Sequence, residues 1–247
     1  MKRQDFPQPY DNMRIDLNSE AAYADSNMKQ RPYPRLMPVP WNTVCKKSVL
    51  TLPAWRKNLT VFPQLYVITG NDIRQKESEG ASAGDIAAVG FGLSIIDDGI
   101  MLASEGGAPR DLGMCYWYSL YTDDSQVLSD DVYPYKGVEN VVLTIESETL
   151  GKASYAQKDL QFEPVSLIRE AGSIVTFLKN DLITMGASAA PLHVAKDRLF
   201  KKGEVIRITA EGLADEPLTL LIPVNDERDP EKFIPSWKPR AFYLGEE

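Results

Sequence analysis

Three side chains, one imidazole and two thiols, limit the chemistry that this sequence can support. His193 is the only histidine among 247 residues, and Cys45 and Cys115 are the only cysteines. A zinc or iron centre rich in histidine is therefore excluded. A nucleophilic triad would have to use His193 as its base, but no G-x-S-x-G motif is present to supply the serine. A Cys–His pair that uses either cysteine remains formally possible.

The charge balance and the hydropathy exclude several classes of partner. The chain has 27 Lys and Arg residues against 35 Asp and Glu residues, which gives a net charge of −8. Duplex nucleic acid and an anionic membrane are therefore not expected as partners. The longest apolar stretch, residues 86–96, is shorter than the roughly 18 residues of a membrane span. The residues after Met1 are charged and polar instead of forming an apolar signal core, so we expect a cytoplasmic protein.

The elements that would position any site belong to a β-rich domain between two less regular ends. Residues 1–40 contain six of the 17 prolines and show no sustained periodicity, which predicts an extended N-terminal arm. Residues 41–224 carry the periodic patterns of a domain. Residues 225–247 hold ten charges and predict a charged C-terminal tail.

Strand patterns outnumber helix patterns inside this domain. Alternating or apolar runs predict strands at residues 65–69, 91–96, 141–145, 181–185, 204–210 and 217–224. A capping-box pattern at residues 82–85 predicts a short helix through residues 86–89, and Pro164 predicts the first turn of a second helix. Residues 99–140 form an aromatic and acidic loop region. The sequence thus predicts an α+β fold that is rich in β-structure.

Two motifs follow the second predicted helix: residues 178–188 read L-K-N-D-L-I-T-M-G-A-S, and residues 199–212 read L-F-K-K-G-E-V-I-R-I-T-A-E-G. These motifs resemble the fumarylacetoacetate hydrolase superfamily. Upstream, residues 40–44 read P-W-N-T-V, which is similar to the start of the domain in the isomerase/decarboxylases of homoprotocatechuate degradation. The resemblance implies a mixed β-sandwich roll with few short helices, a homodimer, and chemistry on carbon–carbon bonds or tautomers of 2-oxo acids.

The resemblance also implies a hard divalent cation, Mg²⁺ or Mn²⁺, held by oxygen ligands. The two glutamates of the family's E-x-E motif fall on Phe62 and Gln64 in this chain, so both charges are absent. A shift of one residue in the alignment brings Asp97 or Asp98 to the position of the family's third ligand. The alternative for these two residues is a turn after a strand. We therefore expect no cofactor, and Mg²⁺ or Mn²⁺ only if the family mechanism is retained.

Two hypotheses about function follow from this combination. In the first, the chain acts on a small 2-oxo or enol acid by hydrolysis, decarboxylation or tautomerisation. Asp97 or Asp98 is then the metal ligand or the acid/base, and the residues predicted to bind the substrate are Gln64, Arg110, Lys136, Gly186 and Ser188. In the second, the chain is a catalytically inactive member of the fold that serves as a binding or structural subunit.

Overall fold

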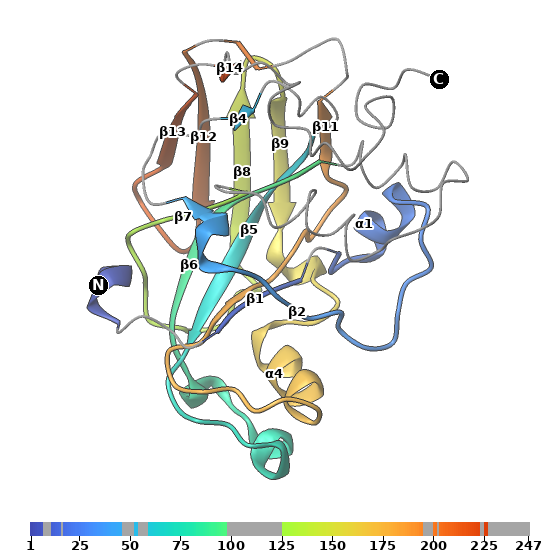
Figure 1. Cartoon of the computed structure of the whole chain (residues 1–247), viewed down its shortest axis with the longest axis vertical. Helices are drawn as coiled ribbons and strands as arrows, with labels where there is room; N and C mark the ends of the chain where they lie inside the picture. Colours follow the sequence, from blue (N-terminus) through green and yellow to red (C-terminus); the bar gives the residue numbers. More distant parts are fainter. Residues whose placement is uncertain are drawn as a thin grey trace, which may run out of the picture.

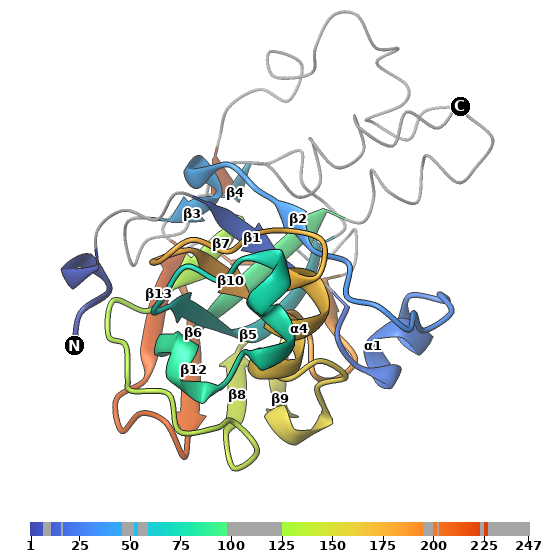
Figure 2. The same ribbon diagram turned by 90° about the horizontal axis from the view of Figure 1, so that it is seen from below.

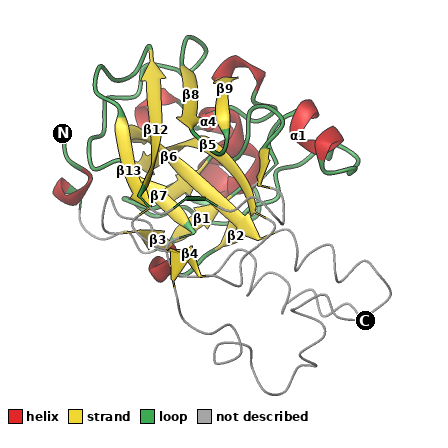
Figure 3. Ribbon diagram, turned by 90° about the horizontal axis from the view of Figure 1, so that it is seen from above, coloured by secondary structure: helices red, strands yellow, loops and turns green. Residues whose placement is uncertain are grey.

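Two β-sheets packed face to face form the body of the molecule (Figure 1). The computed structural model describes residues 1–6, 11–15, 17–45, 52–53, 59–97, 125–194, 200–201, 203–222 and 225–226. Strands are the main regular structure of this described part, and the helices are few and short (Figure 3). The predicted β-rich α+β fold is confirmed.

The larger sheet has eight strands in the described part of the chain. In chain order they are β1 (Asn12–Arg14), β2 (Met37–Pro38), β3 (Val44–Cys45), β5 (Leu59–Thr69), β6 (Ile86–Asp97), β7 (Gln126–Leu128), β10 (Leu182–Thr184) and β11 (Leu192–Val194). Their spatial order is β2-β1-β10-β5-β6-β7-β3, and β11 pairs with the first part of β5. The long antiparallel pair of β5 and β6 is therefore the centre of the sheet.

The smaller sheet has the order β13-β12-β8-β9. Its strands are β8 (Val142–Ser147), β9 (Gly151–Ala156), β12 (Glu204–Glu211) and β13 (Leu218–Ile222). Along β12 buried and exposed residues alternate strictly, which is the pattern of a strand with one face in the core and one in solvent. A further pair of two-residue strands, β4 (Leu52–Pro53) and β14 (Asn225–Asp226), completes the β-structure of the described residues.

The helices lie outside the sandwich. In the described residues the α-helices are α1 (Glu20–Asp25) and α4 (Pro164–Gly172), and short 3-10 helices cover Arg3–Asp5, Trp41–Thr43, Gln75–Gly80, Ala83–Asp85 and Gln157–Asp159. Helix α4 packs beside the 3-10 helix Gln75–Gly80 at one end of the molecule (Figure 2). No helix in the described residues is long and apolar enough to cross a membrane.

The core lies between the two sheets because the strands turn their apolar side chains toward each other. Successive side chains of a strand point to opposite faces, and paired residues share a face. The inner face of the large sheet contributes Val61, Leu65, Val67, Phe91, Leu93 and Ile95, and that of the small sheet contributes Leu143, Ile145, Ile206 and Ile208. The other face of the large sheet therefore carries the alternate residues of β5 and β6.

Several predicted elements are confirmed, with altered bounds. Strand β5 begins at Leu59 instead of residue 65, and α4 begins at Pro164 and ends at Gly172. The predicted helix at residues 86–89 is wrong, because these residues begin strand β6. The capping box itself is present, since Ser82 and Asp85 cap the 3-10 helix Ala83–Asp85, which ends where β6 begins.

The first 40 residues are more than an extended arm. They include α1, and they contribute β1 and β2 to the large sheet, where β1 lies between β2 and β10. Residues 98–124 and 227–247, which hold much of the predicted aromatic loop and the charged tail, lie outside the described residues. Those two predictions are untested.

Candidate functional site

A row of polar side chains lies on the face of the large sheet that points away from the small sheet. Register places seven residues from five strands on this face, and we call this set the polar face. Its members are Asn12, Arg14, Thr60, Gln64, Ser94, Gln126 and Thr184. All seven are buried. Buried polar groups are costly unless they are paired, so such a row requires an explanation.

Arg14 brings a permanent positive charge to this face. Its strand β1 pairs in parallel with β10, so Arg14 lies beside Thr184, and Thr184 lies beside Tyr66 of β5. The guanidinium Nη2 of Arg14 donates a hydrogen bond to the hydroxyl of Ser94 at 2.5 Å. Ser94 is paired with Phe62. We call two directly paired residues of neighbouring strands a rung of the sheet. The side chain of Arg14 thus reaches across the sheet to the Phe62–Ser94 rung, which lies next to the Gln64–Gly92 rung on this face.

Three amides on the polar face have unused hydrogen-bonding capacity. Neither the nitrogen nor the oxygen of the Gln64 amide has a partner among the described residues, and the same is true of Asn12. Gln126 donates from Nε2 to the hydroxyl of Thr43 at 3.1 Å, but its Oε1 has no partner there. Each such buried group costs about 1–3 kcal/mol unless water or a ligand pairs with it. The polar face is therefore able to form further polar contacts.

The polar face does not fit a divalent metal ion. Phe62 has no ligand atom, Gln64 offers one neutral oxygen, and the guanidinium of Arg14 repels a cation. Within the described residues, no group of three or more His, Cys, Asp or Glu side chains could hold a metal. Mg²⁺ and Mn²⁺ prefer several charged oxygens, and these side chains do not supply them.

Of the two predicted catalytic carboxylates, the structure describes only the backbone of Asp97. Asp97 is the last residue of β6 and pairs with Leu59, whereas Gln64 pairs with Gly92. The side chain of Asp97 lies outside the described part, as do the whole of Asp98 and of Arg110. Their predicted roles therefore stay predictions.

The remaining predicted residues come from two separate stretches of the chain, Lys136 from one and Gly186 with Ser188 from the other. Ser188 is buried, and its hydroxyl accepts a hydrogen bond from Nε2 of Gln157 at 2.9 Å. Gly186 has a φ of 73°, which favours glycine, and Lys136 is exposed. No hydrogen bond between described residues links Ser188 or Lys136 to Gln64. A substrate-binding role for these residues is untested.

Sequence reasoning missed Arg14 because it lies in the segment predicted as an arm. A signal was present, since Met13 and Ile15 alternate with Asn12 and Arg14 in the period-two pattern of a strand. It also missed a second polar group, in which His193 joins Thr60 and Asp25 by hydrogen bonds. Both groups depend on residues far apart in sequence.

The fold is shared with solved structures. A fumarylacetoacetate hydrolase family protein from Yersinia pestis CO92 superposes with a TM-score of 0.70 at 16% identity, over 88% of this chain and 94% of that one. A 5-carboxymethyl-2-hydroxymuconate delta-isomerase from Mycobacterium smegmatis gives 0.63 at 15% identity, over 88% and 79%. A fumarylpyruvate hydrolase from Pseudomonas aeruginosa, in complex with Mn²⁺ and pyruvate, gives 0.67 at 16% identity, over 89% and 91%.

These likenesses establish the architecture. No family model and no curated protein matches the sequence. The chain thus has the fold of the fumarylacetoacetate hydrolase family, as the three sequence motifs predicted.

Proposed function

We propose that this chain binds a small 2-oxo or enol carboxylic acid on the polar face and promotes its tautomerisation without a divalent metal. The observation that carries the proposal is the buried guanidinium of Arg14, which reaches the rung of Phe62, the first of the two positions where the family resemblance places metal-binding glutamates. A guanidinium pairs well with a carboxylate because it offers several N–H donors in a planar fork.

Tautomerisation suits these residues better than hydrolysis does. When a 2-oxo acid enolises, negative charge develops on its carbonyl oxygen, and a fixed positive charge nearby stabilises that oxygen. Arg14 supplies such a charge, and the unpartnered amide of Gln64 supplies a donor and an acceptor on the neighbouring rung. Hydrolysis would in addition require an activated water, for which the described polar face holds no carboxylate or metal site.

The solved structures support the substrate class. One of them contains pyruvate, a 2-oxo acid, and another is a delta-isomerase. The proposal departs from that structure in the metal, because the hydrolase that contains pyruvate also contains Mn²⁺.

Calorimetric titration with pyruvate tests the proposal. We expect binding in the presence of EDTA, with no gain on addition of Mn²⁺. Arg14→Met should weaken binding by about tenfold or more, since a hydrogen bond to a charged group contributes about 1.5–3 kcal/mol. Arg207→Met is the matched control, because Arg207 is exposed on the outer face of the small sheet.

A second variant separates ligand binding from folding. Gln64→Leu replaces an unpartnered buried amide by an apolar side chain of similar size, so it should leave the free protein as stable or more stable. It should nevertheless weaken pyruvate binding. Binding by the unmodified protein only when Mn²⁺ is present would contradict the proposal, and so would full binding by both variants.

Complete burial of Arg14, Gln64 and Ser94 favours a second candidate function, that of a catalytically inactive binding or structural subunit. In that case the polar face is part of a closed core. Absence of pyruvate binding with and without Mn²⁺, together with lower stability of Arg14→Met, would support this candidate.

A further inference from the structure

A chain of hydrogen bonds connects three side chains near the start of β5. The hydroxyl of Thr60 lies 3.0 Å from Nδ1 of His193, and Nε2 of His193 lies 2.8 Å from Oδ2 of Asp25. Thr60 comes from β5, His193 from β11 and Asp25 from the end of α1, and α1 lies on the same side of the molecule as β11 (Figure 1). A hydroxyl, an imidazole and a carboxylate are thus joined in a line.

Local structure fixes this geometry. Strand β11 pairs antiparallel with β5, and the register sets His193 directly beside Thr60 on the same face. Helix α1 is held by Ser19, whose hydroxyl accepts a hydrogen bond from the amide of Ala22 at 3.2 Å, and by the burial of Ala22 and Tyr23. These anchors place Asp25 against the imidazole.

Thr60 belongs to the same face of the sheet as Arg14 and its partner Ser94. Ser94 is paired with Phe62, two residues along β5 from Thr60. Two residues of a strand span about 7 Å. On this face of the sheet, Thr60 is therefore the next residue of β5 after the Phe62–Ser94 pair that Arg14 reaches.

Solvent exposure and charge differ among the three hydrogen-bonded side chains. The side chains of His193 and Asp25 are 53% and 23% exposed, whereas Thr60 is buried. Tyr155 of β9 is a titratable group that interacts with Asp25, and its phenol donates to the carbonyl of Ala190 at 3.0 Å. Burial, and after it the charge of Asp25, raises the pKa of Tyr155, so this phenol stays neutral. The hydrogen-bonded chain therefore connects solvent with the polar face, and its carboxylate is that of Asp25.

We infer that Thr60, His193 and Asp25 form a proton relay for an acid held by Arg14. The inference rests on the proposed function and adds the groups that move the proton. In the described part of the polar face, Thr60 is the side chain that connects to an imidazole, the group best suited to accept and return a proton near neutral pH.

The proton balance is simple. In the resting state the Thr60 hydroxyl donates to Nδ1 of neutral His193, and Nε2–H of His193 donates to Asp25. The Thr60 oxygen takes a proton from the carbon next to the substrate carbonyl while its own proton passes to Nδ1. The electrons of the broken C–H bond form the C=C bond of the enolate, and the oxygen of the enolate takes the negative charge beside Arg14. Asp25 stabilises the imidazolium, and the reverse sequence returns the proton to carbon.

The experiment follows exchange of the methyl protons of pyruvate for deuterium, by proton NMR in D₂O with EDTA present, and measures pyruvate binding separately by calorimetry. Thr60→Val and His193→Gln should bind pyruvate as the unmodified protein does and should lose exchange by about 100-fold, the usual range for a general acid–base group. Thr60→Ser keeps the hydroxyl and should retain exchange. Thr209→Val, on the exposed face of β12, is the matched control.

Asp25→Asn provides a readout that a structural role would not change. Loss of the anion disfavours the imidazolium, so the exchange rate should reach its plateau at lower pH than in the unmodified protein, and that plateau should be lower. An unchanged pH profile would overturn the role of Asp25 in the relay.

The outcomes separate the two proposals. Binding with exchange that survives in Thr60→Val or His193→Gln would overturn the relay and leave the proposed function intact. Binding without exchange by the unmodified protein would overturn the relay and also the tautomerisation in the proposed function, and would leave only its ligand-binding part. Absence of pyruvate binding by the unmodified protein would overturn both.

Discussion

A buried guanidinium and a buried amide share the face on which the family resemblance places two carboxylates. Clustered carboxylates repel one another unless a cation is present, whereas Phe62 and Gln64 are neutral and Arg14 is positive. The fold therefore needs no metal to relieve charge repulsion at these positions. The Gln64 amide has no hydrogen-bond partner within the described residues. A polar ligand would supply such a partner.

Glu204 illustrates a carboxylate that stabilises the fold. It lies at the start of β12 and accepts hydrogen bonds from the amide and hydroxyl of Thr149, both at 2.7 Å, and from the amide of Lys201 at 2.9 Å. Burial raises the pKa of the Glu204 carboxyl, but these hydrogen bonds outweigh burial and hold the pKa below its usual value of 4.5. Its stabilising effect is therefore present above pH 4.5 and is lost as the pH falls through the lowered pKa.

Replacing this carboxylate should make stability less dependent on pH. We expect Glu204→Gln to lower the free energy of unfolding by about 1–3 kcal/mol near neutral pH, because hydrogen bonds to the charged oxygens are weakened. The difference from the unmodified protein should shrink below pH 4.5. Urea unfolding at several pH values measures it, with Glu211→Gln at the exposed end of the same strand as the control. A difference that is constant with pH would contradict this account of Glu204.

At the level of elements, the close approach of β5, β6 and β7 depends on two glycines in β6. A Cβ atom on Gly90 would lie 2.3 Å from the ring of Tyr66, whose phenol donates to the carbonyl of Ser129 at 2.6 Å. A Cβ atom on Gly92 would lie 2.0 Å from the backbone oxygen of Val127. The second contact is the more severe, because a backbone atom of a paired strand cannot move aside as a side chain can.

Gly92→Ala should therefore destabilise the large sheet. Overpacking costs about 1–3 kcal/mol, and we expect a value near the upper end because β7 would have to shift. Gly80→Ala is the control, since a Cβ atom there meets nothing within 4 Å. Thermal unfolding of the two variants makes the comparison, and equal melting temperatures would show that β7 does not pair with β6 as described.

The interpretation of residues 82–97 shows where local patterns stop being sufficient. The capping box of Ser82 and Asp85 was a correct signal for a helical turn, and the structure has that turn. Its length could not be predicted, because apolar residues at almost every following position fit a buried strand as well as a helix. These residues form a strand because they pair with the eleven residues of β5. Such long-range pairing cannot be recognised from the local sequence.

On the scale of the whole molecule, the fold was predictable from the sequence and most of the candidate site was not. Turns and strand patterns in residues 178–212 are local, so they identified the architecture. The contacts of the site join residues far apart in the chain: Arg14 and Ser94 are 80 positions apart, and Asp25 and His193 are 168. Such pairs follow from sheet order, which a single sequence does not reveal.

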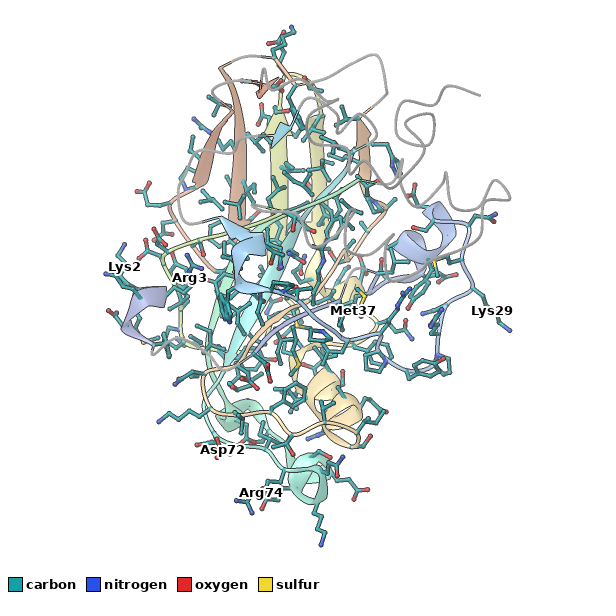
Figure 4. The ribbon with its side chains drawn as sticks, in the orientation of Figure 1. Lys2, Arg3, Lys29, Met37, Asp72 and Arg74 are labelled. Atoms are coloured by element: carbon teal, nitrogen blue, oxygen red, sulfur yellow. The ribbon has the colours of Figure 1, made fainter. Side chains whose placement is uncertain are left out.

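The first 40 residues extend across the molecule and enter its centre. Lys2 and Lys29 lie on opposite sides in Figure 4, and between them Met13 and Ile15 are buried in the core. These two side chains together contribute about 3–6 kcal/mol of hydrophobic stabilisation. The ion pairs of Lys2 with Asp131 and of Arg3 with Asp130 involve exposed side chains and contribute little.

Two truncations should therefore behave differently. Removal of residues 1–38 deletes β1 with Arg14 and all of β2, so we expect loss of cooperative thermal unfolding as followed by circular dichroism. Removal of residues 1–6 should lower the melting temperature much less, since it deletes no strand of the large sheet and costs only the packing of Phe6 and a few hydrogen bonds to residues 130–132. Size-exclusion chromatography of the shorter truncation also tests the predicted homodimer: a dimer that persists without residues 1–6 is held elsewhere. If the protein without residues 1–38 unfolds as cooperatively as the full chain, β1 is not a structural strand of the sheet, and the position of Arg14 on the polar face is wrong with it.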